Sequence, residues 1–199
     1  MIQVLKSILT FPSQTWNGIH NAVMFRFKRV FYAARPKITG KIYIYKTGKV
    51  VFGTGVSINS GATSNPIGGD TRTNLIVSQN AVLTIGDHTG LSNCTIVCQN
   101  GVTIGKHVKI GGSVKIYDTD FHHLKYTERE NRKTDIPLTK SVVIGDHCFI
   151  GAHSIILKGV TIGNKAIIGA GSVVTKSIPE GEVWGGNPAK FIKKIDAIG

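Results

Sequence analysis

The chain has 199 residues and a formal net charge of +13, with 24 Lys and Arg residues against 11 Asp and Glu residues. This length suits one domain, and 41% apolar with 18% charged residues excludes a disordered basic tail. Residues 1–69 contain nine Lys or Arg residues and no acidic residue, so most of the excess charge lies there. Such a segment suits an anionic partner, and charge alone does not choose among a membrane surface, a nucleic acid and a ligand.

Residues 1–36 are expected to form a basic amphipathic helical segment. Apolar residues recur there in steps of three and four, with basic residues between them: Trp16, Ile19, His20, Val23, Phe27, Val30 and Phe31, with Arg26, Lys28 and Arg29. We expect this apolar face to pack on the rest of the chain or on a neighbouring subunit. A peripheral membrane contact is the alternative. No apolar run reaches the roughly 18 residues of a transmembrane helix, so none is expected.

Residues 37–186 carry a six-residue repeat of aliphatic side chains. The longest series, from Ile144 to Val174, has no slip, and shorter series precede it: Ile38, Ile44, Val50 and Val56, then Ile85, Leu91 and Val97, then Ile104, Ile110 and Ile116. A period of six is not helical, but it allows short strands whose alternate residues face inward. Three strands a coil predict a triangular all-β solenoid with one continuous core. Residues 187–199 are expected to be a short basic extension.

The repeat is interrupted at 117–143, a polar stretch that begins YDTDFHH. A long loop expelled from a compact solenoid is usually functional or disordered. Acids, an aromatic residue and two histidines at its start favour function.

The hexads, the DTDFHH loop and the closing IGAGSVVTKSIPEGEVWGGNPAKFIKKI together resemble the hexapeptide-repeat acyltransferases. The resemblance covers about residues 75–195 and is nearest to the maltose and galactoside O-acetyltransferases and the polysaccharide O-acetyltransferases. It implies a left-handed parallel β-helix, a homotrimer with sites between neighbouring prisms, and acetyl-CoA as co-substrate.

The resemblance also assigns roles to individual residues. His122 matches the base that deprotonates the acceptor, with His123 the less favoured candidate, and Asn93 matches an acceptor-binding position. Further positions match cofactor contacts: Ala152, Ala170, Thr175 and Lys176, with Lys190 and Lys193 near the CoA phosphates.

The chemistry of the residues agrees with such a reaction. An imidazole titrates near pH ~6.5, so His122 can take a proton from an alcohol and return it to the CoA thiolate. Asp118 or Asp120 could hold the other ring nitrogen, and the sequence leaves both open. Cys94, Cys98 and Cys148 form no nucleophile or zinc motif, and so few cysteines suit a reducing compartment. His88, His107 and His147 could stack along one edge, but no metal site is expected.

The function expected is therefore that of an acetyl-CoA-dependent O-acetyltransferase acting on a sugar hydroxyl of a polysaccharide or glycolipid precursor. The expected location is the cytoplasm, with membrane association as the alternative. One alternative keeps the chemistry and changes the acceptor to an antibiotic, serine or an amino sugar. Another is a non-catalytic trimeric scaffold. No nucleic-acid motif accompanies the charge, so a nucleic-acid partner is not expected.

Overall fold

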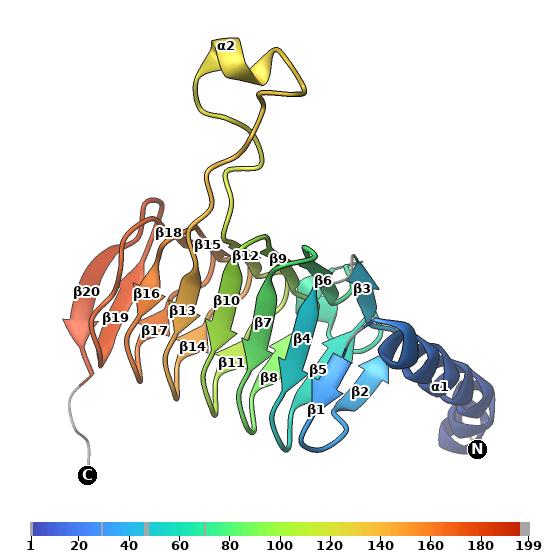
Figure 1. Ribbon diagram of the computed structural model, residues 1–199. Helices are drawn as coiled ribbons and strands as arrows, with labels where there is room; N and C mark the ends of the chain where they lie inside the picture. The colour runs from blue at the N-terminus through green and yellow to red at the C-terminus, as the bar shows by residue number, and fades with distance from the viewer. Residues whose placement is uncertain (1, 29, 46–47, 70, 196–199) are drawn as a thin grey trace.

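The computed structural model describes residues 2–28, 30–45, 48–69 and 71–195. Three parallel sheets form the sides of a triangular prism, with one helix at its N-terminal end and a loop that projects from one edge (Figure 1). The chain visits the three sheets in turn, so each complete coil adds one strand to every sheet. The predicted left-handed parallel β-helix with an N-terminal helix is confirmed.

We name the sheets A, B and C in the order in which the chain visits them. Sheet A contains β1 (Val30–Tyr32), β4 (Lys49–Phe52), β7 (Val82–Ile85), β10 (Gly101–Ile104), β13 (Val142–Ile144) and β16 (Thr161–Ile162). Sheet B contains β2 (Lys37–Gly40), β5 (Ser57–Ser60), β8 (Gly90–Ser92), β11 (Lys109–Ile110), β14 (Phe149–Ile150), β17 (Ile167–Ile168), β19 (Glu182–Gly185) and β20 (Lys190–Lys194). Sheet C contains β3 (Tyr43–Tyr45), β6 (Asn74–Val77), β9 (Thr95–Cys98), β12 (Lys115–Tyr117), β15 (Ile155–Ile156) and β18 (Val173–Val174).

The six-residue repeat places one aliphatic side chain above another in successive coils. In sheet A, Ile104 pairs with both Ile85 and Ile144, and all three side chains are buried. Apolar surface is thereby removed from water along the whole prism, which is the main favourable contribution to folding. One assignment in the repeat was wrong: Ile96, and not Val97, pairs with Ile116 in the core layer of sheet C. Ile96 is only five residues after Leu91, so the turn between β8 and β9 is one residue shorter than the repeat predicts.

The N-terminal segment differs from the sequence expectation in two ways. The helix α1 spans Ile2–Phe27, and β1 begins at Val30, so the first coil starts inside the predicted helical segment 1–36. The side of α1 that faces the prism carries the buried Asn21 and Phe25, whereas the predicted packing face is exposed at Trp16, Ile19, Val23 and Phe27. None of the described helices is long and apolar enough to cross a membrane.

The interruption of the repeat is a projecting loop of residues 118–141, between β12 and β13 (Figure 1). The two ends of the loop are joined by backbone hydrogen bonds. The N–H of Asp120 donates to the carbonyl of Leu138, and the N–H of Lys140 donates to the carbonyl of Asp118. The short helix α2 (Tyr126–Arg129) lies at the tip. At the other end of the chain, the predicted basic extension contains β20, which returns antiparallel along β19.

Candidate active site

The projecting loop holds His122 against a carboxylate thirteen residues further along. Nδ1 of His122 lies 2.7 Å from Oδ2 of Asp135, and Oδ1 of Asp135 accepts the backbone N–H of His123, also at 2.7 Å. The His122 bond is the largest cause, and the His123 bond the second, of a pKa of Asp135 below its ordinary value. Asp135 is therefore ionised at neutral pH and favours a proton on Nδ1 of His122. Nε2 is then left with a lone pair, as a general base requires.

The expected partners of His122 were wrong, because both aspartates have other structural roles. Asp118 is fully buried, and its carboxylate accepts the backbone N–H groups of three consecutive residues, each at 2.8 Å: Gln99, Asn100 and Gly101. It stabilises the turn between β9 and β10 in the preceding coil. Asp120 pairs with Lys158 at 3.2 Å at the base of the loop. Neither carboxylate bonds to His122.

The second histidine of the loop, His123, stabilises the conformation of the loop. Nδ1 of His123 accepts the N–H of Lys125 at 3.1 Å, and its carbonyl accepts a bond from the Arg129 guanidinium at 3.1 Å. These bonds fix the turn that leads into α2. His122, whose side chain is 66% exposed, is thus the better placed of the two to meet a substrate.

Asn93 does not present its side chain to the surface. The residue is fully buried, and its amide binds the backbone of the loop at 61–69, which we call the excursion because it interrupts the repeat. Oδ1 of Asn93 accepts the N–H of Gly61 at 2.8 Å, and Nδ2 donates to the carbonyl of Asn65 at 3.0 Å. A Cβ at Gly68 would lie 2.5 Å from that of Asn93, so only glycine fits this contact. The expected acceptor contact through this amide is therefore not available, and Asn93 positions the excursion instead.

Three of the residues assigned to the cofactor line one hollow. Thr175, Lys176 and Lys190 surround a space of about 330 Å³ near the C-terminal end of the prism, together with Trp184, Pro188, Ala189 and Phe191. Two lysines beside aromatic and aliphatic residues suit an anionic ligand that also has an apolar part. Lys193 lies further along β20, opposite Val183, and does not line this space.

The candidate residues lie on two different edges of the prism. The loop with His122 and the turn with Thr175 and Lys176 each follow a strand of sheet C, and Lys158 follows β15 between them. Since stacked strands are about 4.8 Å apart, the base of the loop and this turn are roughly 10 Å apart along the edge between sheets C and A. Ala152, Ala170 and Asn93 instead follow strands of sheet B, at the edge between sheets B and C. A single prism therefore does not bring all of them together.

The remaining sequence candidates offer neither a nucleophile nor a metal site. Burial is the largest cause that raises the pKa of Cys94 and Cys98 to about 12 and that of Cys148 to about 11, so these thiols are protonated and unreactive at neutral pH. The rings of His88, His107 and His147 do stack, with centroids 5.0 and 4.9 Å apart. Within the described ranges, no group of three or more His, Cys, Asp or Glu side chains could hold a metal ion.

Sequence reasoning missed two features of the site. Asp135 lies in the polar part of the loop, where only the folded turn through His123 brings it to His122. Trp184 and Phe191 line the hollow because β20 folds back on β19 and pairs them with each other. The only available signal for the latter was the GGNP turn between them.

Comparison with known proteins relates the repeat and the fold to acetyltransferases. A family described as the hexapeptide repeat of succinyl-transferase matches residues 141–176. Nodulation protein L of Rhizobium leguminosarum bv. viciae is 49% identical over 98 residues, which are 49% of this chain and 50% of that protein. Protein CapG of Staphylococcus aureus is 46% identical over 100 residues, 48% of this chain and 54% of its own length. The chain thus spans about half the length of the curated relatives it matches.

Solved structures are similar over most of the chain. A hexapeptide-repeat-containing acetyltransferase from Vibrio cholerae O1 biovar eltor, complexed with acetyl coenzyme A, is 25% identical with a TM-score of 0.59 and covers 88% of this chain and 75% of its own. A galactoside acetyltransferase in complex with coenzyme A is 26% identical with a TM-score of 0.55, over 88% of this chain and 69% of its own. The prism is therefore the fold of hexapeptide-repeat acetyltransferases.

Proposed function

We propose that this hexapeptide-repeat chain, which has the fold of the solved acetyltransferases, is an acetyl-CoA-dependent O-acetyltransferase for a sugar hydroxyl. The observation that carries the proposal is the pair of His122 and Asp135, held in a loop on the same edge as the turn with Thr175 and Lys176, which lines the hollow. The galactoside acetyltransferase supports a saccharide acceptor through its similarity, and a polysaccharide or glycolipid precursor is the acceptor we favour.

The proposed reaction is a direct transfer. Nε2 of His122 takes the proton of the acceptor hydroxyl as its oxygen attacks the thioester carbonyl carbon. The new C–O bond forms, the C–S bond breaks, and the imidazolium returns the proton to the departing CoA thiolate. Asp135 holds the ring and stabilises the imidazolium during this exchange. The protonated state of the buried cysteines supports a route without an acyl-enzyme, and their reduced state suits a cytoplasmic protein.

The cofactor is proposed to lie along two edges that meet between subunits. Lys176 and Lys190 would bind phosphates of CoA as point charges, and Trp184 and Phe191 offer apolar surface to the same ligand. Thr175 lines this hollow, while Ala152 and Ala170 lie on the edge between sheets B and C. In a homotrimer, that edge of one prism can face the loop of its neighbour. Lys193 is retained as a candidate phosphate contact outside the hollow.

The loop itself supports a trimer. Its apolar side chains are exposed on a segment that projects from the prism (Figure 1): Phe121, Leu124, Tyr126, Ile136 and Leu138. Exposed apolar side chains concentrated in this way are typical of a protein contact. A neighbouring prism would cover them and would exclude water from the thioester.

The test is an assay with acetyl-CoA and a panel of sugars, amino sugars and small alcohols, with the free CoA thiol as the readout. We expect turnover with a saccharide hydroxyl and a loss of about 10²- to 10⁴-fold in kcat for His122→Ala. His107→Gln, on an edge remote from the loop, is the matched control. Full turnover by His122→Ala would remove the proposed base.

Other outcomes would favour the alternatives. Turnover with amine acceptors alone, at a rate that rises as pH passes the pKa of the amine, would indicate an N-acetyltransferase. No thermal shift with millimolar CoA, together with no turnover, would leave a trimeric scaffold as the better description.

A further inference from the structure

The helix α1 exposes a continuous apolar stripe. In its described side chains, Trp16 is 68% and Phe27 76% exposed, and Ile19 and Val23 between them are each about half exposed. The four residues follow one another in steps of three and four, so they lie on one side of the helix. In the sequence, apolar residues precede them at similar steps, at Ile2, Leu5 and Leu9. A helix that only closed the end of the prism would not need this stripe.

The stripe cannot turn inward, because the other side of α1 is fixed to the prism. Nδ2 of Asn21 donates to the carbonyl of Gly40 at 3.0 Å, and Oδ1 of Asn21 accepts the N–H of Ile42 at 3.1 Å. Phe25 is buried and packs on Phe52, with ring centroids 5.9 Å apart. Helix and first coil therefore form one rigid surface, with the apolar stripe facing away from the core.

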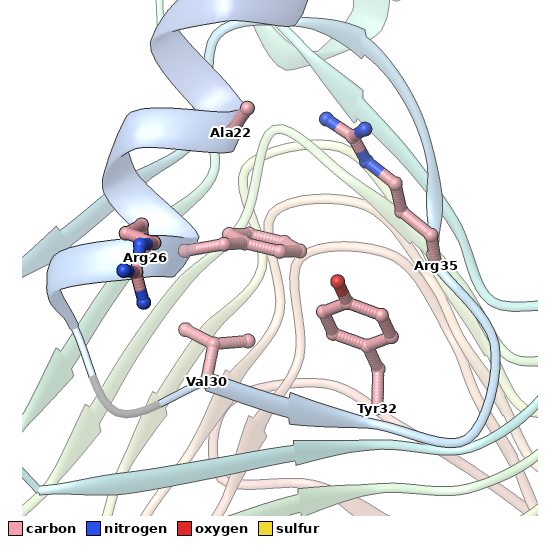
Figure 2. A pocket seen from close by; sticks show the side chains of 6 residues that line it. Ala22, Arg26, Val30, Tyr32 and Arg35 are labelled. Carbon is pink, nitrogen blue, oxygen red and sulfur yellow. The ribbon is translucent and has the colours of Figure 1, made fainter.

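Cations adjoin the stripe, and no acid is near them in the sequence. Arg26 and Arg35 lie on opposite sides of a hollow of about 330 Å³, and Tyr32 lines it on the side of Arg35 (Figure 2). The ammonium group of Lys49 lies 5.1 Å from the ring centre of Phe31, which is half exposed on the opposite face of β1 from Val30 and Tyr32. None of the ion pairs found among the described residues involves Arg26, Arg35 or Lys49.

We propose that this surface docks the protein on an anionic lipid bilayer. The stripe would enter the boundary between headgroups and acyl chains, and Arg26 and Arg35 would bind lipid phosphates. An apolar face with aromatic residues, flanked by basic groups, is the pattern of a helix that lies in the plane of the interface. Aromatic rings such as those of Trp16, Phe27 and Tyr32 are favoured at this depth.

A second copy of the chain is the less suitable occupant. A symmetric pair of stripes would bring Arg26 and Arg35 of two copies together, and residues 1–69 supply no carboxylate to neutralise them. The helix α1 also lies at the end of the prism, away from the part from which the loop with His122 projects (Figure 1). A trimer built around that loop would leave α1 free to meet a surface.

The test is sedimentation of the full chain with vesicles, which needs no catalytic readout. We expect binding to vesicles with about one third phosphatidylglycerol and little binding to phosphatidylcholine alone, weakening as salt rises from about 0.05 M to about 0.5 M. Tryptophan emission should shift to shorter wavelength on binding. The shift should disappear in Trp16→Phe, since Trp184 lies at the far end of the prism.

Variants separate the two parts of the surface. Ile19→Gln with Val23→Gln should lower the partition coefficient about tenfold or more, since both side chains would enter the lipid. Arg26→Gln and Arg35→Gln should each lower it about fivefold on anionic vesicles only. Gly18→Gln is the matched control on the same helix, at an exposed position where an added Cβ meets no atom within 4 Å.

Two results would contradict membrane docking. Equal binding by the Ile19→Gln/Val23→Gln variant, or no vesicle binding by the wild-type chain, would overturn it. If the wild-type chain formed an assembly larger than a trimer that this variant reduced to trimers, the stripe would be an interface between copies instead.

Discussion

The Nδ1 atom of His122 lies 2.7 Å from Oδ2 of Asp135, whose other oxygen accepts the N–H of His123. The carboxylate thus joins two consecutive loop residues and fixes both the orientation and the tautomer of His122. This arrangement lies wholly within the projecting loop. A substitution that affects only the loop should therefore change the proton transfer and leave the prism unaltered.

Asp135→Asn should lower kcat about 10- to 10³-fold, because the amide can donate to Nδ1 and leave the proton on Nε2. The pKa of Asp135 lies below its ordinary value, so its contact with His122 is present above that ordinary value and is lost only as pH falls through the lowered one. In the wild-type chain, no change in rate above pH 3.8 should therefore come from the titration of Asp135 itself. The measurement is the pH profile of kcat/KM for both chains.

Asp135 is a positioning residue in this account, and a merely structural role predicts different kinetics. Asp135→Glu should recover part of kcat, and the dissociation constant for CoA should stay at its wild-type value in both variants. An equal loss in Asp135→Asn and Asp135→Glu with an unchanged pH profile would contradict the account.

Asp118→Asn should destabilise the prism. Its carboxylate accepts three backbone N–H groups at 2.8 Å and is fully buried. The NH₂ group of asparagine cannot accept these bonds, so at least one buried N–H group would lose its acceptor or face another donor. We expect the free energy of unfolding to fall by about 3–5 kcal/mol, with a lower Tm in thermal unfolding. Asp146→Asn is the control, because Asp146 accepts from the N–H of Lys106 at a half-exposed turn and should cost much less. A variant at Asp118 that melts like the wild-type chain but loses turnover would return this residue to the catalytic machinery.

The three cysteines should resist modification in the folded protein. Burial raises the pKa of Cys148 to about 11 and those of Cys94 and Cys98 to about 12, against 9.0 for a free thiol. At one pH, the thiolate fraction is thus at least about a hundredfold smaller than in an exposed cysteine. A disulfide reagent at pH 8 should release little colour until denaturant is added, and then three equivalents of thiol. Rapid modification of one native cysteine with loss of turnover would instead indicate an acyl-enzyme.

The prism is well predicted from the sequence because the aliphatic residue at every sixth position identifies the core. Each of Ile144, Ile150, Ile156, Ile162, Ile168 and Val174 takes the buried position expected of it. Whether a side chain faces inward depends on its place in the alternation along a strand. The order of apolar and polar residues in the sequence shows this alternation directly. The prediction failed for Val97, because the step from Leu91 to the next core residue is five residues long and ends at Ile96.

Side-chain partners are less predictable, since they depend on where a turn leads. Asp118 and Asp120 are the nearest acids to His122 in the sequence, yet the chain turns so that one faces the preceding coil and the other faces Lys158. For α1, periodicity showed two helix faces but could not tell which one meets the prism. Asn21 decided that, through two hydrogen bonds that no hydrophobic pattern reveals.

Lys176→Ala and Lys190→Ala should each raise KM for acetyl-CoA about threefold to tenfold, with little change in kcat. Both lysines line the hollow with Trp184 and Phe191, and we assign them to phosphates far from the reacting thioester. The sharper comparison uses acetyl-pantetheine, which has no nucleotide phosphates. With that substrate, the two variants should behave like the wild-type chain. Lys106→Ala, which removes a pair with Asp87 on another edge, is the matched control and should alter neither substrate's KM. If the loss were equal for acetyl-CoA and acetyl-pantetheine, these lysines would act on the thioester or on the fold, and the hollow would not be the nucleotide site.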